Sequence, residues 1–386
     1  MHLPPFALER YFARYEFAVR HLLSSSDCES MSIQDLLSLE PGAGERFLGH
    51  RLGYTESSGS PSLRQRVCGL YAGIGAEQVL VTAGAEEAIF LFMHAALEEG
   101  GHVVVQQPCY QSLFEVARGI GCPVTGWLAR EEDRWAPDLD ELKRLIRPET
   151  KVLIVNTPHN PTGSHMEPGR FRALASLADE RGIILFSDEV YRGLERRESD
   201  RLPAACDLSP LAVSLGVMSK TYGLAGLRIG WGATRNDRVR ARMASLKDYT
   251  TICSSAPGEF LAEVALRHGE AIAARSRALI ASNLALLDAF FARHKDSFSW
   301  QPPQAGPIAF PRLLRGEVES FCDRLAREKS VLLLPGTVYG DTGNHFRIGF
   351  GRKSLPEGLR CLEEFVEEEF SPTKARGQTR PPRTPS

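Results

Sequence analysis

The chain has 386 residues, and its 46 lysines and arginines against 48 aspartates and glutamates give a formal net charge of −2. This near-neutral balance offers no electrostatic basis for binding nucleic acid or an anionic membrane, and no apolar run approaches the length that spans a bilayer. With 43% hydrophobic and 24% charged residues, the composition is that of a soluble globular protein, and the length favours two lobes.

The eight cysteines indicate a reducing environment. Because none of them forms a C-x-x-C pair, free thiols are favoured over a disulfide framework or a zinc site. The first residues also lack the basic segment and apolar core of a signal peptide. We therefore expect a cytoplasmic protein.

Short β-rich runs alternate with amphipathic helices along most of the chain. Residues 1–45 are helical in pattern and rich in serine, and we expect them to form the N-terminal part of a small domain. Residues 46–283 are expected to form a large domain. Its predicted strands are 78–82, 102–105, 124–128, 151–155, 182–186, 211–217 and 228–233, and the predicted helices among them are 86–98, 110–119, 139–146 and 169–180.

The last third of the chain has a different pattern. Residues 284–370 contain a long helix, a segment interrupted by proline and glycine at 301–311, and a strand-like run at 331–334. We expect them to complete the small domain. Residues 371–386 are rich in proline, arginine and threonine and are predicted to be a disordered tail.

Continuously apolar strands alternating with helices predict a mostly parallel, seven-stranded sheet covered by helices on both faces, which is an α/β fold. Ligands of such sheets collect at the carboxyl ends of the strands. Polar side chains that follow strands are therefore the candidates for function.

Lys220 follows the apolar run 211–217, at the expected end of a buried strand. Burial lowers the pKa of a lysine and frees an amine that can attack a carbonyl. Arg228, in a glycine-punctuated turn, offers a fixed cation suited to a phosphate. A nucleophilic amine and a phosphate anchor on one loop are what a pyridoxal-phosphate Schiff base requires. The plainer alternative is a surface lysine.

Asp188 comes just after the predicted strand 182–186. A carboxylate within an apolar sheet requires a cationic partner. A protonated pyridine nitrogen would serve, and its proton would make the ring an electron sink. Tyr191 could reach the phenolic oxygen of such a ring. The alternative for Asp188 is the N-cap of a helix.

Two turns after strands offer further contacts. Asn160 lies in an Asn-Pro-x-Gly turn and could bond the O3′ oxygen of the cofactor, or could simply belong to a loop. Ala85 and Glu86 open a helix after a turn of small residues, where backbone N–H groups can approach a phosphate.

Tyr110 and Arg347 have one functional and one plain interpretation each. Tyr110 could stack on a flat ring or be an ordinary loop aromatic. Arg347 is a lone arginine in an apolar run and needs an anion, for which a substrate carboxylate is one candidate.

In combination these residues resemble the class I and II aminotransferases, which are fold type I pyridoxal-phosphate enzymes. The resemblance covers roughly residues 45–370 and runs through Tyr54-Thr55, Gly59, Leu63-Arg64, Gly84-Ala85, Tyr110, 159–163, 187–191, Ser219-Lys220, Arg228 and Arg347. It implies pyridoxal phosphate as the cofactor and Lys220, Asp188 and Tyr191 as catalytic residues. Lys220 would be the Schiff-base lysine and proton carrier, and Asp188 would bind the ring nitrogen.

The resemblance also implies contacts for the rest of the cofactor and for the substrate. Asn160 and Tyr191 would bind O3′, Tyr110 would stack on the ring, and Ser219, Arg228 and the backbone of Ala85 and Glu86 would hold the phosphate. Arg347 would take the α-carboxylate, and Asn160 is a further candidate for substrate binding. Members of the family are homodimers, in which Tyr54 would reach the phosphate of the neighbouring subunit.

Two segments depart from the family pattern. Val217 stands where a hydroxyl or glycine is usual, which weakens the expectation of one phosphate contact. The serine run in 22–30 replaces a Gly-x-Pro stretch and looks like capreomycidine synthase, an enzyme of the same fold that cyclises a hydroxylated arginine. Segments 248–251 and 308–312 look similar to that enzyme too.

The predicted function is transfer of an amino group between an L-amino acid and a 2-oxo acid through Lys220. The alternative is a lyase or cyclase acting on a hydroxylated arginine-like amino acid, because both reactions share their first steps. A non-enzymatic regulator that joins this fold to a DNA-binding domain is disfavoured by the near-neutral charge and by the lack of a preceding winged-helix segment.

Asp27 and Glu29 lie in the segment that covers the active site in relatives. If either carboxylate points inward, it would favour a substrate with a cationic side chain. Alternatively, both carboxylates could cap the helix that is expected to begin near Ser32.

Overall fold

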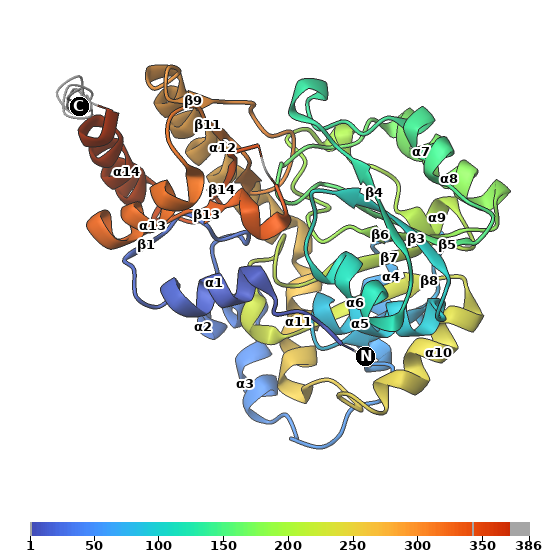
Figure 1. Cartoon of the computed structure of the whole chain (residues 1–386). Coiled ribbons are helices and arrows are strands. Elements are labelled where there is room, and N and C mark those ends of the chain that lie inside the picture. Colours follow the sequence, from blue (N-terminus) through green and yellow to red (C-terminus); the bar gives the residue numbers. More distant parts are fainter. Residues whose placement is uncertain (1, 342, 371–386) are drawn as a thin grey trace, which may run out of the picture.

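The computed structural model describes residues 2–341 and 343–370, and its centre is a seven-stranded sheet (Figure 1). The strand order is β2-β8-β7-β6-β5-β3-β4, and within this sheet only β8 runs antiparallel to its neighbours. The bounds are β2 (Val79–Thr82), β3 (His102–Gln107), β4 (Val124–Leu128), β5 (Thr150–Asn156), β6 (Ile184–Asp188), β7 (Val213–Val217) and β8 (Gly230–Thr234). The mostly parallel sheet predicted from the sequence is confirmed.

Helices cover both faces of the sheet (Figure 1). Val104 packs in one apolar cluster with residues of α7 (Leu139–Leu145), α8 (Pro168–Glu180) and α9 (Ala205–Leu208). Its neighbours Val103 and Val105 point the other way, toward α5 (Ala85–Ala96) and α6 (Ser112–Ile120), beside which lies α10 (Asp237–Lys247). Side chains alternate between the faces of a strand, so burial of both faces requires strands that are apolar throughout.

A further group of helices packs against the edge of the sheet that β2 and β8 form. Val81 and Trp231 share an apolar cluster with α2 (Ile33–Ser38), α4 (Pro61–Cys68) and α11 (Ala256–Arg267), and α3 (Ala43–Leu48) lies beside α2. Short 3-10 turns are η1 (Ala76–Gln78), η2 (Glu131–Asp133), η3 (Glu198–Asp200), η4 (Ala225–Leu227) and η5 (Gly336–Tyr339). Over the described ranges, no helix is long and apolar enough to cross a membrane.

A segment from the N-terminal part of the chain pairs with one from the C-terminal part beside the large sheet. Strand β1 (His21–Leu22) pairs with β12 (Val331–Leu332), which is about three hundred residues away in sequence. The other small strands are β9 (Phe298–Ser299), β10 (Ile308–Ala309), β11 (Arg312–Leu313), β13 (Leu334–Pro335) and β14 (Phe346–Gly349), and the helices are α1 (Ala7–Tyr15), α12 (Gly269–Arg293), α13 (Val318–Lys329) and α14 (Leu355–Phe370). This pairing supports the proposal of a small domain built from both ends.

Two details differ from the sequence-based expectation. The run 331–334 forms two strands, β12 and β13, which belong to different sheets. The expected division after residue 283 falls inside the continuous helix α12. The tail predicted for residues 371–386 lies outside the described residues.

Candidate active site

A cavity of about 280 Å³ opens at the carboxyl ends of β5, β6 and β7. Parallel strands present their carboxyl ends at one edge of a sheet, so side chains that are distant in sequence converge there. The sequence-predicted residues that line the cavity are Ala85, Glu86, Tyr110, Asn160, Asp188, Tyr191, Ser219, Lys220, Arg228 and Arg347.

Lys220 comes three residues after the end of β7 and points into the cavity. Its Nζ donates a hydrogen bond of 2.8 Å to Ser26 Oγ and lies 6.0 Å from the centre of the Tyr191 ring. Removal from water lowers the pKa of the Lys220 amine. A larger neutral fraction makes this amine a better nucleophile, which agrees with the interpretation made from the sequence.

Asp188 is the last residue of β6 and is 6% exposed. Its Oδ1 accepts a hydrogen bond of 3.2 Å from the Val190 N–H, and no cationic side chain of the described residues forms an ion pair with it. Burial raises the pKa of the Asp188 carboxyl to about 7. No α-helix begins at Asp188, so the N-cap interpretation is wrong. A buried carboxyl without a cation is suited to bind one.

Tyr191 and Asn160 present polar groups on the same side of the cavity. The Tyr191 hydroxyl is buried and makes no hydrogen bond of normal geometry with the described residues, although the Ser26 hydroxyl lies near it. Asn160 Oδ1 accepts 3.1 Å hydrogen bonds from the Tyr339 hydroxyl and from Arg347 Nη1. Asn156 Oδ1 in turn accepts from the Asn160 N–H at 2.6 Å, which fixes the turn. A buried hydroxyl without a partner indicates a missing acceptor or donor on a ligand.

The turn between β2 and α5 forms a cradle with Arg228. Gly84 has φ +84°, and a Cβ there would lie 2.5 Å from Arg228 Nη2. Arg228 itself has φ 52° and donates to the Ala225 carbonyl at 3.2 Å. No carboxylate of the described residues pairs with it. The guanidinium and the free N–H groups at the start of α5 therefore meet at one point, which suits a phosphate.

Two other residues lie near this cradle. The Glu86 carboxylate accepts from Ser112 Oγ at 3.1 Å, and burial raises its pKa to about 7. Val217 lines the cavity with an apolar side chain, so it supplies no hydroxyl for a phosphate.

Arg347, on β14, is 1% exposed and is held by neutral oxygens. Its Nε and Nη2 donate to the Ser24 carbonyl at 3.2 and 2.6 Å, and its Nη1 donates to Asn160 Oδ1 and the Tyr339 hydroxyl. None of these partners neutralises its charge, and no carboxylate of the described residues pairs with it. This arrangement leaves a fixed positive charge at the cavity.

Tyr110 lines the cavity under the N-terminal segment. Its ring lies 5.0 Å from the ring of Phe6, and its hydroxyl donates to Glu9 Oε1 at 3.4 Å. The helix α1 thus covers this side of the cavity with Leu8, Glu9 and Phe12.

The structure gives Asp27 and Glu29 partners on the segment after β14, and Asp27 also lies near enough to Lys220 to favour its charged form. Asp27 forms a bidentate ion pair with Arg352 at 3.0 and 2.8 Å, and Glu29 accepts from the Lys353 N–H at 2.8 Å. Neither residue lines the cavity. Nor do they cap α2, because Ser32 and Asp35 form its capping box. This pairing with the segment after β14 joins residues far apart in the chain and was not readable from the sequence.

Tyr54 is 93% exposed and lies outside the cavity of its own chain. The predicted role at the phosphate of a neighbouring subunit is therefore still a prediction.

Several cavity residues were not identified as site residues from the sequence, among them Ser26, Glu9 and Phe12. Ser26 binds Lys220, and Glu9 and Phe12 come from α1. Tyr339, which binds Arg347 from outside the cavity lining, was also not identified. The spacing of Leu8, Phe12 and Tyr15 is that of an amphipathic helix, in keeping with the helical pattern expected for residues 1–45. The cavity that this helix covers could not be predicted from that spacing.

The site combines a nucleophilic amine, a buried carboxyl that lacks a cation, an unpartnered phenol and a phosphate cradle. These features fit a phosphorylated, hydroxylated pyridine aldehyde, that is, pyridoxal phosphate.

Comparison with known proteins gives a consistent result. The sequence model of the family described as aminotransferase class I and II matches residues 23–357. Capreomycidine synthase from Streptomyces vinaceus is 31% identical over 384 residues, which cover 98% of this chain and 96% of that protein.

Two solved structures superpose closely on this one. A PLP-dependent aminotransferase from Streptococcus suis 89-1591 gives a TM-score of 0.90 at 32% identity, and the match covers 95% of this chain and 99% of that one. The PLP-dependent cyclase OrfR gives a TM-score of 0.88 at 33% identity, with 96% and 98% covered.

Proposed function

Since this chain belongs to the aminotransferase class I and II family and uses pyridoxal phosphate, we propose that it transfers an amino group from an L-amino acid to a 2-oxo acid. The observation that carries this proposal is the convergence of Lys220, Asp188 and Arg347 on one cavity. An amine, a carboxyl for a ring nitrogen and a cation for an α-carboxylate are the groups that such a reaction needs.

The residues around the cavity account for each part of the cofactor. Asp188 would bind the ring nitrogen, and Tyr191 and Asn160 would bind O3′. The ring of Tyr110 would stack on the pyridine. Ser219, Arg228 and the backbone N–H groups of Ala85 and Glu86 would hold the phosphate.

When bound, pyridoxal phosphate supplies an aldehyde that condenses with amines and a ring that accepts electrons from the substrate's α-carbon. Lys220 Nζ would take the substrate's α-proton and carry it within the site, a role that suits an amine whose pKa is lowered by burial. Ser26 Oγ, at 2.8 Å, orients this amine. Asp188 holds the proton of the ring nitrogen, and Arg347 orients the substrate by its carboxylate.

We propose further that the substrate has a cationic side chain. Once Asp188 is assigned to the cofactor, Glu9 and Glu86 are the carboxylates left in the lining of the cavity. Neither forms an ion pair with a cation among the described residues, and each contributes to raising the pKa of a neighbour in the cavity. A guanidinium or ammonium side chain would neutralise them. These two residues replace Asp27 and Glu29 as the candidates for substrate selection.

A lyase or cyclase reaction is the second candidate. The observation that favours it is the match to capreomycidine synthase over nearly the whole of both chains, together with the superposition on a PLP-dependent cyclase. Both reactions begin with loss of the α-proton, so the residues described above serve either one.

One experiment separates the two reactions. The protein loaded with pyridoxal phosphate is incubated with L-arginine and its hydroxylated forms, with and without pyruvate as acceptor. Amino transfer that requires pyruvate supports the first proposal, whereas conversion without an acceptor supports the second. Lys220→Ala is the control and should abolish both.

A further inference from the structure

A second cavity, of about 200 Å³, lies directly behind the candidate active site. Val190 and Val217 line both cavities, so one layer of side chains separates them. The other walls come from the loop after β6, the segment after α4 and the junction of α11 and α12. None of the residues assigned above to the cofactor or the substrate lines this second cavity.

Glu189 lines this cavity with a buried carboxyl. The residue is 6% exposed, and its Oε1 accepts 2.8 Å hydrogen bonds from the Ala205 N–H and from Ser214 Oγ. Its Oε2 is buried and accepts no hydrogen bond of normal geometry from the described residues, although the Ser187 hydroxyl lies near the carboxyl. Burial raises the pKa of the Glu189 carboxyl. A buried, half-satisfied carboxyl costs free energy unless a donor reaches it.

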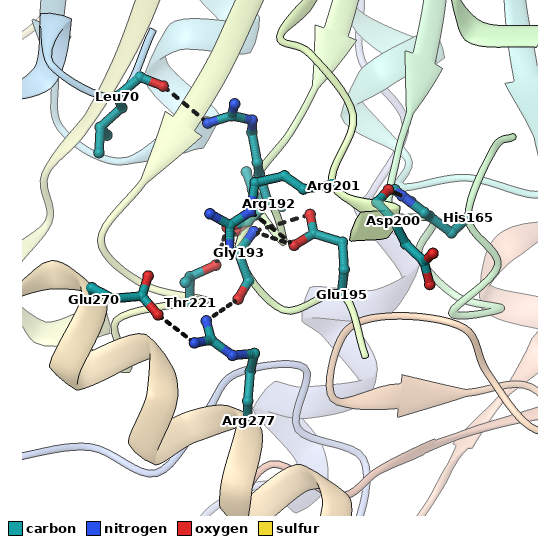
Figure 2. A network of polar contacts seen from close by, with 11 residues as sticks. Leu70, His165, Arg192, Gly193, Glu195, Asp200, Arg201, Thr221, Glu270 and Arg277 are labelled. Atoms are coloured by element: carbon teal, nitrogen blue, oxygen red, sulfur yellow. Dashed lines mark hydrogen bonds and ion pairs between the residues drawn. The ribbon is translucent and has the colours of Figure 1, made fainter. Parts of the chain in front are cut away.

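Arg192 and Arg201 also line this cavity. Figure 2 shows Arg192 beside the Leu70 carbonyl and Arg201 beside Glu195. Arg192 reaches the Leu70 carbonyl through Nη1 at 3.0 Å, while its buried Nε has no acceptor, and it pairs with no carboxylate of the described residues. Arg201 binds Glu195 through Nε at 3.3 Å, and no described residue accepts from its terminal NH₂ groups.

The remaining walls are mostly apolar, apart from Thr221 and Glu270, whose carboxylate pairs with Arg277. Leu70, Leu266 and Trp231 line the cavity together with the rings of Tyr71 and Tyr222. An anion alone would satisfy the arginines but would be repelled by Glu189, and a cation alone would leave the arginines without partners. A small zwitterion with an apolar group would match the carboxyl of Glu189, the two arginines and the apolar side chains together.

We propose that this second cavity binds a free α-amino acid with a small apolar side chain. Its carboxylate would accept hydrogen bonds from Arg192 and Arg201, and its ammonium group would donate to Glu189 Oε2. Its side chain would pack against the apolar walls. The charged ends are thereby matched by charge-assisted hydrogen bonds, which are the stronger kind.

Occupancy of this cavity is coupled to the active site by short covalent links. Glu189 directly follows Asp188, and Thr221 directly follows Lys220. The Thr221 hydroxyl donates to the Arg192 carbonyl at 2.9 Å. A ligand that fixes Arg192 and Glu189 therefore restrains the two residues that carry the proposed chemistry.

The test uses 2-aminoisobutyrate, a zwitterion without an α-hydrogen, and the full chain loaded with pyridoxal phosphate. Calorimetric titration should show two binding events per chain, and only one of them should change the absorption of the cofactor. Arg192→Gln and Arg201→Gln should each weaken the event that leaves the absorption unchanged by about tenfold or more. The other event should persist.

Arg235→Gln is the matched control, because Arg235 is also half-buried and donates to backbone carbonyls but lines neither cavity. It should leave both events unchanged. A single event that changes the cofactor absorption, or a second event that is insensitive to both cavity variants, would show that the second cavity holds only water. If only the event that leaves the absorption unchanged is seen, this inference stands, and the active site rejects a small apolar side chain, as expected for a cationic substrate.

Discussion

Burial moves Lys220 and Asp188 toward their neutral forms. The pKa of the lysine is lowered and the pKa of the aspartic acid is raised, in both cases mainly because the charged form loses its hydration. A protonated pyridine between them would restore the charge of Asp188. The two residues are therefore suited to bind a cationic ring rather than to form an ion pair with each other.

We expect Lys220 to be the residue that attaches the cofactor covalently. Reduction of the loaded protein with borohydride followed by peptide mapping should locate the cofactor on Lys220, and Lys220→Ala should remove the attachment. Lys247 is the internal control, since its pKa is also lowered by burial but it lies outside the cavity. Attachment at Lys247 or at any other lysine would contradict the assignment.

We expect Asp188 to make the cofactor-free protein less stable as the pH rises from about 4 to about 7. Its carboxyl ionises near pH 4 in an unfolded chain, whereas its pKa is raised to about 7 in the folded protein. Between these values the folded state binds one proton more than the unfolded state, so the free energy of unfolding falls as the pH rises.

Chemical denaturation of the cofactor-free protein at about pH 4.5 and about pH 7.5 measures this effect. Asp188→Asn cannot ionise, so it should lose less stability than the wild type over the same interval. Equal losses in the two proteins would mean that the carboxyl is already ionised at the lower pH.

At the scale of elements, the turn from β2 into α5 and the loop that carries Arg228 are packed against each other. A Cβ on Gly230 would lie 2.7 Å from the Gly84 carbonyl carbon, and a Cβ on Gly84 would lie 2.5 Å from Arg228. The turn therefore accepts only glycine, and this close approach fixes the guanidinium beside the start of α5.

Gly84→Ala should weaken binding of pyridoxal phosphate by about tenfold or more, because the methyl group displaces Arg228 in addition to straining the backbone. Gly182→Ala is the control, since Gly182 also has a positive φ, +62°, but no atom lies within 4 Å of its added Cβ. Fluorescence titration with the cofactor gives both dissociation constants. A similar loss in both variants would indicate general strain rather than loss of the cradle.

Helix α1 covers the cavity and brings the Glu9 carboxylate to it. Glu9→Gln should lower kcat/KM for L-arginine about fivefold, since a partly exposed ion pair contributes about 1 kcal/mol. It should leave L-citrulline, which has a neutral side chain of similar length, unaffected. Glu16→Gln, at the C-cap of the same helix but outside the cavity, is the control. Equal effects on the two substrates would reject a charge-based role.

At the scale of the whole molecule, one region exposes large apolar side chains together. Leu48 and Leu52 are 87% and 83% exposed, and Tyr54 and Tyr249 are 93% and 90% exposed. The two segments lie side by side, because Thr55 Oγ1 donates to the Ser254 carbonyl at 3.0 Å. Several large apolar side chains exposed on neighbouring segments are typical of a protein interface.

We propose that this region joins two copies of the chain, as the position of Tyr54 predicts. Sedimentation of the full chain should give a dimer, and Leu52→Arg should shift it toward the monomer with weaker cofactor binding. Phe17→Arg is the control, because Phe17 is 94% exposed but lies at the end of α1. A wild-type monomer with full activity would refute the proposal.

The sequence by itself determined the sheet and the residues at the ends of its strands. Apolar runs and helical periodicity are local properties, and a lysine, an aspartate and an asparagine that follow such runs must reach the same edge of a parallel sheet. Lys220, Asp188 and Asn160 could therefore be placed at one site before the structure was known.

Only the tertiary structure decided what surrounds these residues. Arg347 is held by the carbonyl of Ser24, Lys220 is bonded to Ser26, and Glu9 reaches the cavity from α1. Asp27, which the sequence suggested as a substrate-binding residue, forms an ion pair with Arg352. Each of these contacts joins segments that are far apart in the chain. They depend on how the N-terminal segment packs across the C-terminal strands, and periodicity within either segment carries no information about that packing.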